Sequence, residues 1–205
     1  MLRPPHYRPG FDWFAPLYDL GVWLASLLVG GEARIRRLTI EAMLGTDFKS
    51  VPSCSKGCRT LDVCCGTATL SLLMAERGAL VYGLDIAKGM LKVAKEKAIK
   101  GDIRIGLVQA DAVSIPFKER VFERVVVSMG LHEIPFDRMR DVFKEVRRVL
   151  KEGGRFVTLD YHRAEGIPGI LQRLFFLFTE HSTAREWLRS DLQRELRVAG
   201  FKGFQ

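Results

Sequence analysis

Apolar and polar residues follow one another along the chain in a pattern that predicts alternating strands and helices. Short apolar runs of this kind are typical of buried strands. We expect five of them: one around Leu61 and Val63, and others at Leu80–Asp85, Ile103–Val108, Val121–Val127 and Arg155–Asp160. Because strands and helices alternate, the pattern predicts an α/β fold whose parallel sheet is covered by helices on both faces.

Apolar residues at helical spacing lie between and after these strands. We expect four helices here: one that carries Leu70–Met74, one from Lys88, one from about Phe136 to Lys151, and one from the capping box Ser190–Gln193 through Ala199. The hydroxyl of Thr67 or Thr69 would cap the first helix, and Gly78 would end it. Gly153–Gly154 would stop the third.

The N-terminal part of the chain has a different pattern. Residues 1–12 are rich in proline and predict an arm, whereas apolar and aromatic residues recur at helical spacing from Trp13 to about Met43. One or two helices are expected there, broken near Gly30–Gly31. We therefore divide the chain into an N-terminal helical lid, residues 1–44, and a domain at residues 45–205, which together form one structural unit.

Two apolar segments raise the question of membrane contact. The apolar core of the lid, Leu20–Val29, is far shorter than the ~20 residues that cross a bilayer. The lid therefore either packs on the domain or also rests on a membrane surface, with aromatic residues and arginines at the interface. Residues 170–178 form either a wall over an apolar substrate or a packed helix.

Composition narrows the choice of partners only a little. The 32 Lys and Arg residues exceed the 24 Asp and Glu residues, and the net charge of +8 favours anionic lipid surfaces or nucleic acid without identifying either. Since the spacing of Cys54, Cys58, Cys64 and Cys65 includes no CxxC, we expect inert side chains rather than a metal site or a Cys54–Cys58 disulfide. No signal peptide is apparent, so we expect a cytoplasmic protein.

The first predicted strand and the loop after it carry the strongest sign of ligand binding. Gly66 permits backbone angles that a side chain would resist. Asp85 ends the next strand about 20 residues after Asp62, a spacing that suits a carboxylate gripping both ribose hydroxyls of a nucleoside. Alternatively, Asp85 caps the helix from Lys88. The pattern G-x-G-x-x-G of a dinucleotide site is absent, which argues against a bound pyrophosphate.

Four motifs in this order resemble those of class I S-adenosylmethionine-dependent methyltransferases. They are L-D-V-C-C-G-T-A at residues 61–68, G-L-D-I-A-K-G-M-L at 83–91, A-D-A at 110–112 followed by I-P-F at 115–117, and L-H at 131–132. The resemblance covers residues from about 59 to 160. It implies a Rossmann-like, doubly wound, mostly parallel sheet that binds S-adenosyl-L-methionine.

The same resemblance implies a set of cofactor-binding residues. In chain order they are Asp62, Cys64, Cys65, Gly66 and Thr67 beneath the methionine part, Asp85 at the ribose hydroxyls, Ile86 and Met90 beside adenine, Asp111 and Ala112 at the adenine edge, and Ser128 and Met129 on the methyl-donor side. The family pattern is D-x-G-x-G-x-G, and here Cys64 and Ala68 replace its outer glycines. Both are small, so we expect the cofactor still to fit.

A second departure from the family lies at the C-terminus. Such methyltransferases usually continue through a final pair of strands, whereas Phe201–Gln205 has room for the start of one only. Either the chain shown is trimmed, or its sheet is shorter.

The N-terminal motif F-A-P-L-Y-D-L, residues 14–20, looks like the lid of the quinone C-methyltransferases of ubiquinone and menaquinone synthesis and is similar to that of small phospholipid N-methyltransferases. The resemblance implies a lipophilic acceptor, held in line with the methyl group in a dry pocket. The acceptor needs help only in losing a proton. We expect His132 to be the base and Tyr18 to orient it or to touch the cofactor. Alternatively, His132 is structural, with Glu133 nearby.

Two other functions stay open. The altered glycine loop and the missing strands favour a non-catalytic S-adenosylmethionine-binding or membrane-associated protein on the same fold. The basic charge suits a nucleic-acid methyltransferase, but Ser128–Leu131 stands where an Asn/Asp-Pro-Pro-aromatic motif would bind an amino group of a base. Nucleic acid is therefore not the expected partner. The acceptor atom and the oligomeric state are not predicted.

Overall fold

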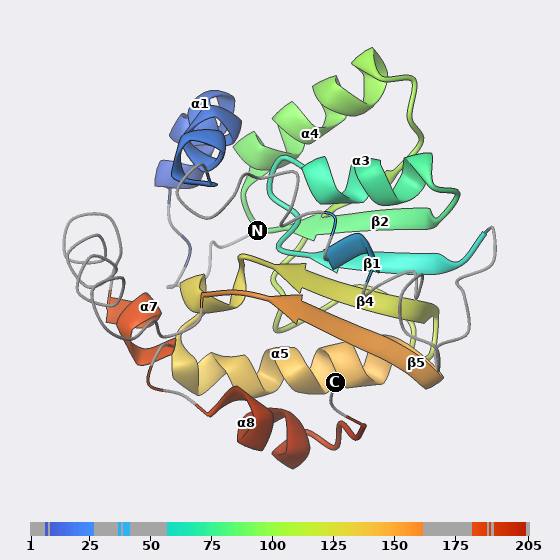
Figure 1. Ribbon diagram of the computed structural model, residues 1–205, viewed down its shortest axis with the longest axis vertical. Coiled ribbons are helices and arrows are strands. Elements are labelled where there is room, and N and C mark those ends of the chain that lie inside the picture. The colour runs from blue at the N-terminus through green and yellow to red at the C-terminus, as the bar shows by residue number, and fades with distance from the viewer. Residues whose placement is uncertain are drawn as a thin grey trace.

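The computed structural model describes residues 7, 9–26, 37, 39–41, 57–161, 182–187, 189 and 191–203. Five parallel strands form one sheet in the order β3-β2-β1-β4-β5 (Figure 1). The strands are β1 (Arg59–Val63), β2 (Leu80–Asp85), β3 (Gly106–Gln109), β4 (Phe122–Ser128) and β5 (Leu150–Leu159). The predicted α/β fold with a parallel sheet is confirmed.

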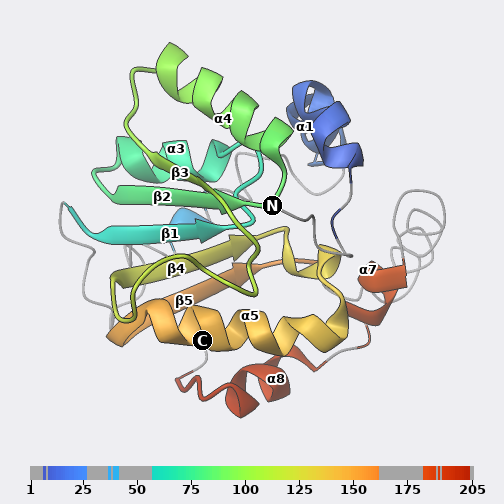
Figure 2. The same cartoon turned by 180° about the vertical axis from the view of Figure 1, so that it is seen from behind.

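Helices cover both faces of this sheet. The helices in the described part of the chain are α1 (Gly10–Ser26), α3 (Thr69–Glu76), α4 (Lys88–Lys100), the short 3-10 helix η2 (Leu131–Glu133), α5 (Phe136–Val149), α7 (Ser182–Trp187) and α8 (Leu192–Val198). Figures 1 and 2 show α3 and α4 on one face and α5 with α8 on the other. Two successive crossovers of one hand carry the chain from β1 out to β3, and the chain then returns to β4, which explains this division.

Alternation along the strands builds a core on each face. The neighbours Val125 and Val126 point to opposite sides, because successive side chains of a strand alternate. Val126 packs in the cluster of α3, and Val125 packs in the larger cluster that contains Phe143 of α5. Ile40, from the segment predicted as lid, is buried in the α3 cluster, so part of that segment belongs to the body of the domain.

Several predicted boundaries are wrong. Helix α5 ends at Val149, and β5 begins at once with Leu150, so that Gly153–Gly154 lie inside the strand instead of stopping the helix. The pairing between β4 and β5 shifts register between Phe122 and Arg124, and the glycines occupy this irregularity, where Gly153 has a φ of 70°. Strand β3 begins at Gly106 rather than Ile103, and α1 begins at Gly10, inside the predicted arm.

The predicted helix caps differ in the same way. Ala68, with a φ of 59°, is the N-cap residue of α3, and its methyl group makes no capping hydrogen bond. The hydroxyls of Thr67 and Thr69, which were predicted to cap this helix, donate to Asp19 instead. Asp191 caps α8 by accepting a hydrogen bond from the N–H of Arg194.

The described residues near the C-terminus, up to residue 203, do not continue the sheet. Within residues 191–203, Phe201 packs against Phe156 with ring centroids 5.3 Å apart, and no strand follows β5 in the described part of the chain. No helix among the described residues is both long and apolar enough to span a bilayer. The apolar run at residues 170–178 lies outside the described residues.

The cysteines only partly follow prediction. Cys58 is disulfide-bonded, so the expectation of four inert cysteine side chains is wrong. A disulfide forms only where two thiols lie at a suitable distance, and the spacing of cysteines in a sequence does not give that distance. Cys54 lies outside the described residues. Cys64 and Cys65 are free thiols that point in different directions, as expected, Cys64 toward Gly130 and Cys65 toward Gly83.

Candidate functional site

The loops that follow β1 and β4 meet at the carboxyl edge of the sheet. These neighbouring strands connect onward in opposite directions, and such a reversal point is where open α/β sheets bind ligands. The contact is close: a Cβ atom on Gly130 would lie 2.6 Å from Cβ of Cys64. Only glycine fits at residue 130, and the candidate site lies at this edge.

The loop after β1 has an unusual backbone. Cys64, Gly66 and Ala68 have φ angles of 59°, 54° and 59°, which lie in the left-handed region. A residue with a side chain costs about 1–2 kcal/mol there, so Cys64 and Ala68 are strained. Met129, just after β4, has a φ of 57°. Strain of this kind gathers where a backbone is held in position for a ligand.

Asp85 ties this loop to the start of α4. Its Oδ2 accepts a hydrogen bond from the N–H of Gly66, and its Oδ1 accepts one from the N–H of Ala87, each at 2.8 Å. Burial raises the pKa of the Asp85 carboxyl above its ordinary value, although these N–H groups oppose the rise. Ala87 is the N-cap residue of α4 and its side chain makes no capping hydrogen bond, whereas Asp85 binds the N–H of Ala87 itself. Asp85 therefore lies before the helix and is not its N-cap residue. A carboxylate has about four acceptor positions, which leaves capacity for hydroxyl groups.

Four carboxylates act on the same thiol. Burial raises the pKa of Cys64 well above its ordinary value, and the charges of Asp85, Asp62, Asp160 and Asp111 add to the rise in that order. Asp85 ends β2 opposite Gln109 of the parallel strand β3, and Asp111 follows two residues after Gln109, so both carboxylates lie at the same edge of the sheet. Their contact with one ligand stays a prediction. Protonated His132 offsets the charge of Asp160, and the other carboxylates at this edge favour a cationic ligand.

The other predicted site residues surround this edge, each held by its own contacts. Asp62 accepts a hydrogen bond from the hydroxyl of Ser71 at 2.6 Å, and the N–H of Cys65 donates to the Leu84 carbonyl. Asp111 accepts from the N–H of Val113, Ala112 is buried in the main core, and the Ile86 carbonyl accepts from the Gln109 side chain. Ser128 ends β4, and the N–H of Met129 donates to the Leu159 carbonyl. Met90 of α4 is buried against α1. Their contacts with a cofactor stay predictions.

Helix α1 lies over the loop after β1. Tyr18 packs in the core between α1 and α4, and its Cε1 is 3.9 Å from the position of a Cβ on Gly66. Of its two predicted roles, this place suits contact with the cofactor. Asp12 accepts a hydrogen bond from the N–H of Gly89 at 2.5 Å and a second one from the hydroxyl of Tyr7.

A second polar contact fastens α1, and we call it the Asp19 cluster: Asp19, Thr67, Thr69 and Lys97. Asp19 Oδ1 accepts from the hydroxyl of Thr67 at 2.6 Å and from that of Thr69 at 3.3 Å, while Asp19 Oδ2 accepts from Nζ of Lys97 at 2.8 Å. Partial burial raises the pKa of Asp19, but the hydrogen bonds from Lys97 and Thr67 outweigh it and hold the pKa below its ordinary value. The cluster joins α1, the loop and α4.

We expect Gly89→Ala to release α1 while the domain stays folded. A Cβ atom at residue 89 would lie 2.6 Å from both Cα and O of Asp12, so α1 must move. Inside α4 the same change favours the helix by about 1 kcal/mol. Hydrogen exchange across Gly10–Ser26 should therefore accelerate by about tenfold or more, without loss of global stability.

Gly21→Ala is the matched control, because a Cβ there meets nothing within 4 Å. It should leave exchange in α1 unchanged or slower. Equal exchange in the wild type and in Gly89→Ala would contradict the close approach of α1 to α4.

His132 lies at the same edge of the sheet, in η2. Its Nδ1 is 2.7 Å from Asp160 Oδ1, and its Nε2 is 3.5 Å from Glu133 Oε1. Burial lowers the pKa of His132, but Asp160 and Glu133 outweigh it and raise the pKa to about 10. The ring packs edge-on against Tyr161, with centroids 4.7 Å apart. The contacts suit an imidazole oriented by a carboxylate, and they equally suit the structural role weighed beside it.

Asp160 is a site residue that the sequence reading missed. Its Oδ2 accepts from the N–H groups of Leu131 and His132, and its Oδ1 accepts from that of Tyr161. The signal was present, since Asp160 follows directly on β5 and carboxylates at that edge gather at ligand sites. Asp12, Asp19 and Lys97 were also missed, and no spacing rule joins residues so far apart in the chain.

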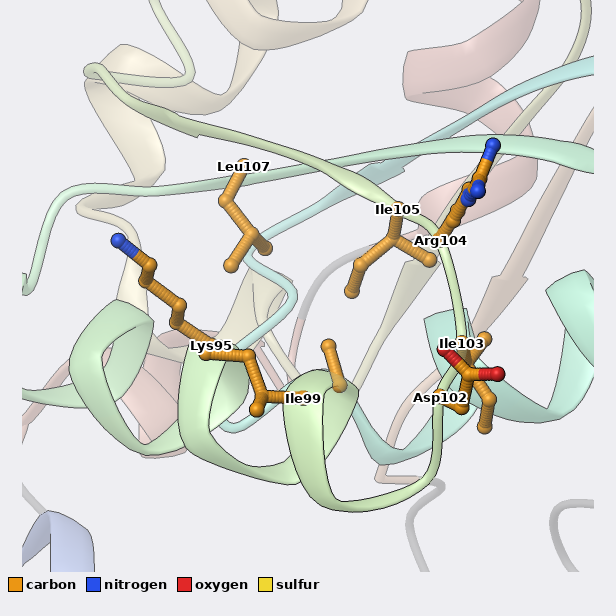
Figure 3. A pocket seen from close by; sticks show the side chains of 8 residues that line it. Lys95, Ile99, Asp102, Ile103, Arg104, Ile105 and Leu107 are labelled. Atoms are coloured by element: carbon orange, nitrogen blue, oxygen red, sulfur yellow. The ribbon is translucent and has the colours of Figure 1, made fainter.

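A separate hollow of about 380 Å³ lies between the second half of α4 and the segment entering β3 (Figure 3). Lys95, Ile99, Asp102, Arg104 and Leu107 are among the side chains that line it. It contains none of the predicted site residues. Within the described ranges, no group of three His, Cys, Asp or Glu side chains is placed to hold a metal ion.

Comparisons with known proteins agree with this geometry. Residues 60–154 match a family described as a methyltransferase domain. An uncharacterized methyltransferase of Synechocystis is 34% identical over 188 residues, which are 90% of this chain and 82% of that protein. A demethylmenaquinone methyltransferase of Listeria monocytogenes is 41% identical over 118 residues, 56% of this chain and 48% of that protein. This chain thus matches about half the length of the menaquinone relative.

A solved structure shares the fold. The phosphoethanolamine N-methyltransferase 2 of Haemonchus contortus, in complex with phosphomonomethylethanolamine and S-adenosylhomocysteine, has a TM-score of 0.65 over 84% of this chain and 37% of its own, with 22% sequence identity. At that identity the likeness concerns the fold alone.

Proposed function

We propose that this chain, which belongs to the family of S-adenosylmethionine-dependent methyltransferases, methylates a small lipophilic acceptor. The acceptor is either a quinone-like ring or a phospholipid head group. The observation that carries the cofactor assignment is the strained loop after β1, which Asp85 holds through the N–H of Gly66 at the carboxyl edge of the sheet. A sulfonium is a cation without phosphate, so it suits an edge with several carboxylates and a loop with a single glycine.

The cofactor, when bound, supplies a methyl group that is already electrophilic. The residues proposed to hold it are those of the edge. Asp85 would accept hydrogen bonds from the ribose hydroxyls with the lone pairs that Gly66 and Ala87 leave. Asp111 would meet the adenine edge, and Tyr18 would exclude water above the loop. The remaining sequence-predicted positions are part of this proposal.

The acceptor is inferred from two observations on the sequence. The segment at residues 14–20 resembles the lid of enzymes that take lipophilic acceptors, and a 41% identical relative is a demethylmenaquinone methyltransferase. The head-group alternative rests on the resemblance of the lid alone. With such an acceptor the protein would work at the cytoplasmic side of a membrane, in peripheral contact with it.

His132 is proposed as the base that takes the acceptor's proton. Asp160 holds Nδ1, and Nε2, which lies 3.5 Å from Glu133 Oε1, is the atom proposed to accept the proton. Since the pKa of His132 is about 10, the neutral imidazole is a minor species at pH 7, and its fraction rises with pH. A base is needed only for a carbon or hydroxyl acceptor.

We expect methyl transfer from labelled S-adenosylmethionine to a component of a total lipid extract. The wild-type protein is incubated with the labelled donor and with either the lipid extract or a water-soluble extract, and the labelled product is identified by mass spectrometry. Asp85→Ala, which is expected to bind the cofactor about 100-fold more weakly, serves as the control. Label in the water-soluble fraction alone would contradict the lipophilic acceptor, and thermal stabilisation by S-adenosylhomocysteine without any labelled product would favour a non-catalytic binding protein.

A further inference from the structure

Helix α1 turns several polar side chains toward the protein and large apolar side chains toward solvent, the reverse of an ordinary amphipathic surface helix. Its polar side chains Asp12, Tyr18 and Asp19 face the protein, where they contact Gly89, the loop after β1 and Lys97. Ala15 and Phe11 pack inward beside them, whereas most of the large apolar side chains face outward. The outward residues are Trp13, Phe14, Leu17, Leu20 and Trp23, whose exposed fractions run from 49% at Trp23 to 86% at Trp13.

This orientation is set by specific contacts. The hydrogen bonds of Asp12 and Asp19 fasten α1 to α4 at two points about two turns apart, so the helix cannot roll its apolar side inward without breaking both. Single exposed apolar residues are ordinary on a protein surface, but five on one face of a helix mark an interaction surface. We call this surface the outer face of α1.

Charge and residue type indicate which partner covers it. The other exposed positions from Gly10 to Trp23 are Gly10, Pro16 and Gly21, so the described part of the outer face carries no charge. The neighbouring helix α4, which contacts α1, exposes Lys88, Lys92 and Lys95 at helical spacing, against one exposed acid, Glu96. Tryptophans beside a row of lysines suit the boundary between head groups and acyl chains of an anionic bilayer.

We propose that the outer face of α1 docks on an anionic lipid bilayer, with the lysines of α4 at the head groups. This inference rests on the proposed function, since a lipophilic acceptor resides in the bilayer. Figures 1 and 2 show α1 beside the start of α4, at the end of the sheet where β2 ends. Docking through α1 therefore brings the edge that holds Asp85 and Gly66 to the membrane surface.

The experiment is sedimentation of the full chain with vesicles of phosphatidylglycerol and phosphatidylcholine, or of phosphatidylcholine alone. We expect the wild type to bind the anionic vesicles and Leu17→Glu to bind them at least about tenfold more weakly. The matched control is Val198→Glu on α8, because Val198 and Leu17 are exposed to a similar extent, 65% and 63%. That control should bind like the wild type.

Tryptophan fluorescence provides a second readout. Trp13 and Trp23 are exposed and Trp187 is buried, so an emission shift to shorter wavelength on adding vesicles reports on α1. Failure of the wild type to bind anionic vesicles, or equal loss in both variants, would overturn docking. So would a dimer in solution that Leu17→Glu dissociates, because a second copy would then cover the face.

The outcomes for docking and for the proposed function are separate. Vesicle binding needs no cofactor, so binding without methyl transfer would reject the function and retain the docking. Methyl transfer to detergent-dispersed lipid by a protein that binds no vesicles would retain the function and reject the docking. Leu17→Glu should bind S-adenosylhomocysteine as the wild type does.

Discussion

Asp85→Ala is expected to weaken binding of S-adenosylhomocysteine by about 100-fold or more, since two charge-assisted hydrogen bonds to the ribose would be lost. It should also lower the free energy of unfolding by about 2–4 kcal/mol, because the buried N–H groups of Gly66 and Ala87 lose their acceptor. Titration calorimetry and urea denaturation measure the two effects. A loss of this size leaves an ordinary domain folded.

Two further variants separate the loss of the contacts of Asp85 from the effect of substituting any carboxylate. Asp85→Asn keeps one acceptor oxygen and should lie between the wild type and the alanine variant in both measurements. Asp141→Ala, at a half-exposed position on α5, should change the free energy of unfolding by about 0.5 kcal/mol or less. Binding by Asp85→Ala within about threefold of the wild type would remove Asp85 from the cofactor site.

His132→Ala is expected to slow methyl transfer by about 100-fold while S-adenosylhomocysteine still binds, if the acceptor loses a proton to this base. In the wild type the rate should rise with pH between 7 and 9 by about tenfold per unit, because the neutral imidazole fraction grows toward the pKa of about 10. Full turnover by His132→Ala would remove the residue from the mechanism and leave it the structural role.

The same raised pKa makes a prediction about stability. A histidine whose pKa is higher in the folded state than in the unfolded chain stabilises the fold fully below the unfolded value of about 6.5. That contribution is lost as pH rises through the folded value of about 10. The free energy of unfolding of the wild type, relative to that of His132→Gln, should therefore fall by a few kcal/mol between pH 7 and pH 10. Parallel pH profiles would contradict the charged pairing with Asp160 and Glu133.

The parts of the fold that the sequence predicted are those that depend on local pattern. Leu80–Asp85 was predicted with its exact bounds, because an apolar run of strand length ends there in a carboxylate. The parallel sheet followed from the alternation of strands and helices. The position of Asp85 and Asp111 at one edge of the sheet followed from the rule that parallel strands end at the same edge.

The errors have a shared physical origin. The glycines at 153 and 154 read as a helix stop, but pairing with β4 drew them into a strand. Thr67 and Thr69 read as helix caps, but their hydroxyls bind Asp19, which is 48 and 50 residues away. In each case a contact between distant segments outweighs the local preference, and one sequence does not reveal such contacts.

The backbone angles of the loop after β1 and the orientation of α1 could not be predicted from the sequence for the same reason. Spacing marked Gly66 as the residue that needs glycine, while the left-handed angles of Cys64 and Ala68 appear only in the structure. The pattern from Trp13 onward predicted a helix but not its orientation. The contacts of Asp12 and Asp19 decide which side faces solvent.

The central claim is that the edge formed by the loop after β1 and the end of β2 binds S-adenosylmethionine. Hydrogen exchange of the wild type with and without S-adenosylhomocysteine tests it most directly. We expect slower exchange at residues 64–68 and 85–90 and unchanged exchange in α8. Unchanged exchange at both segments, or protection confined to the hollow between α4 and β3, would contradict it.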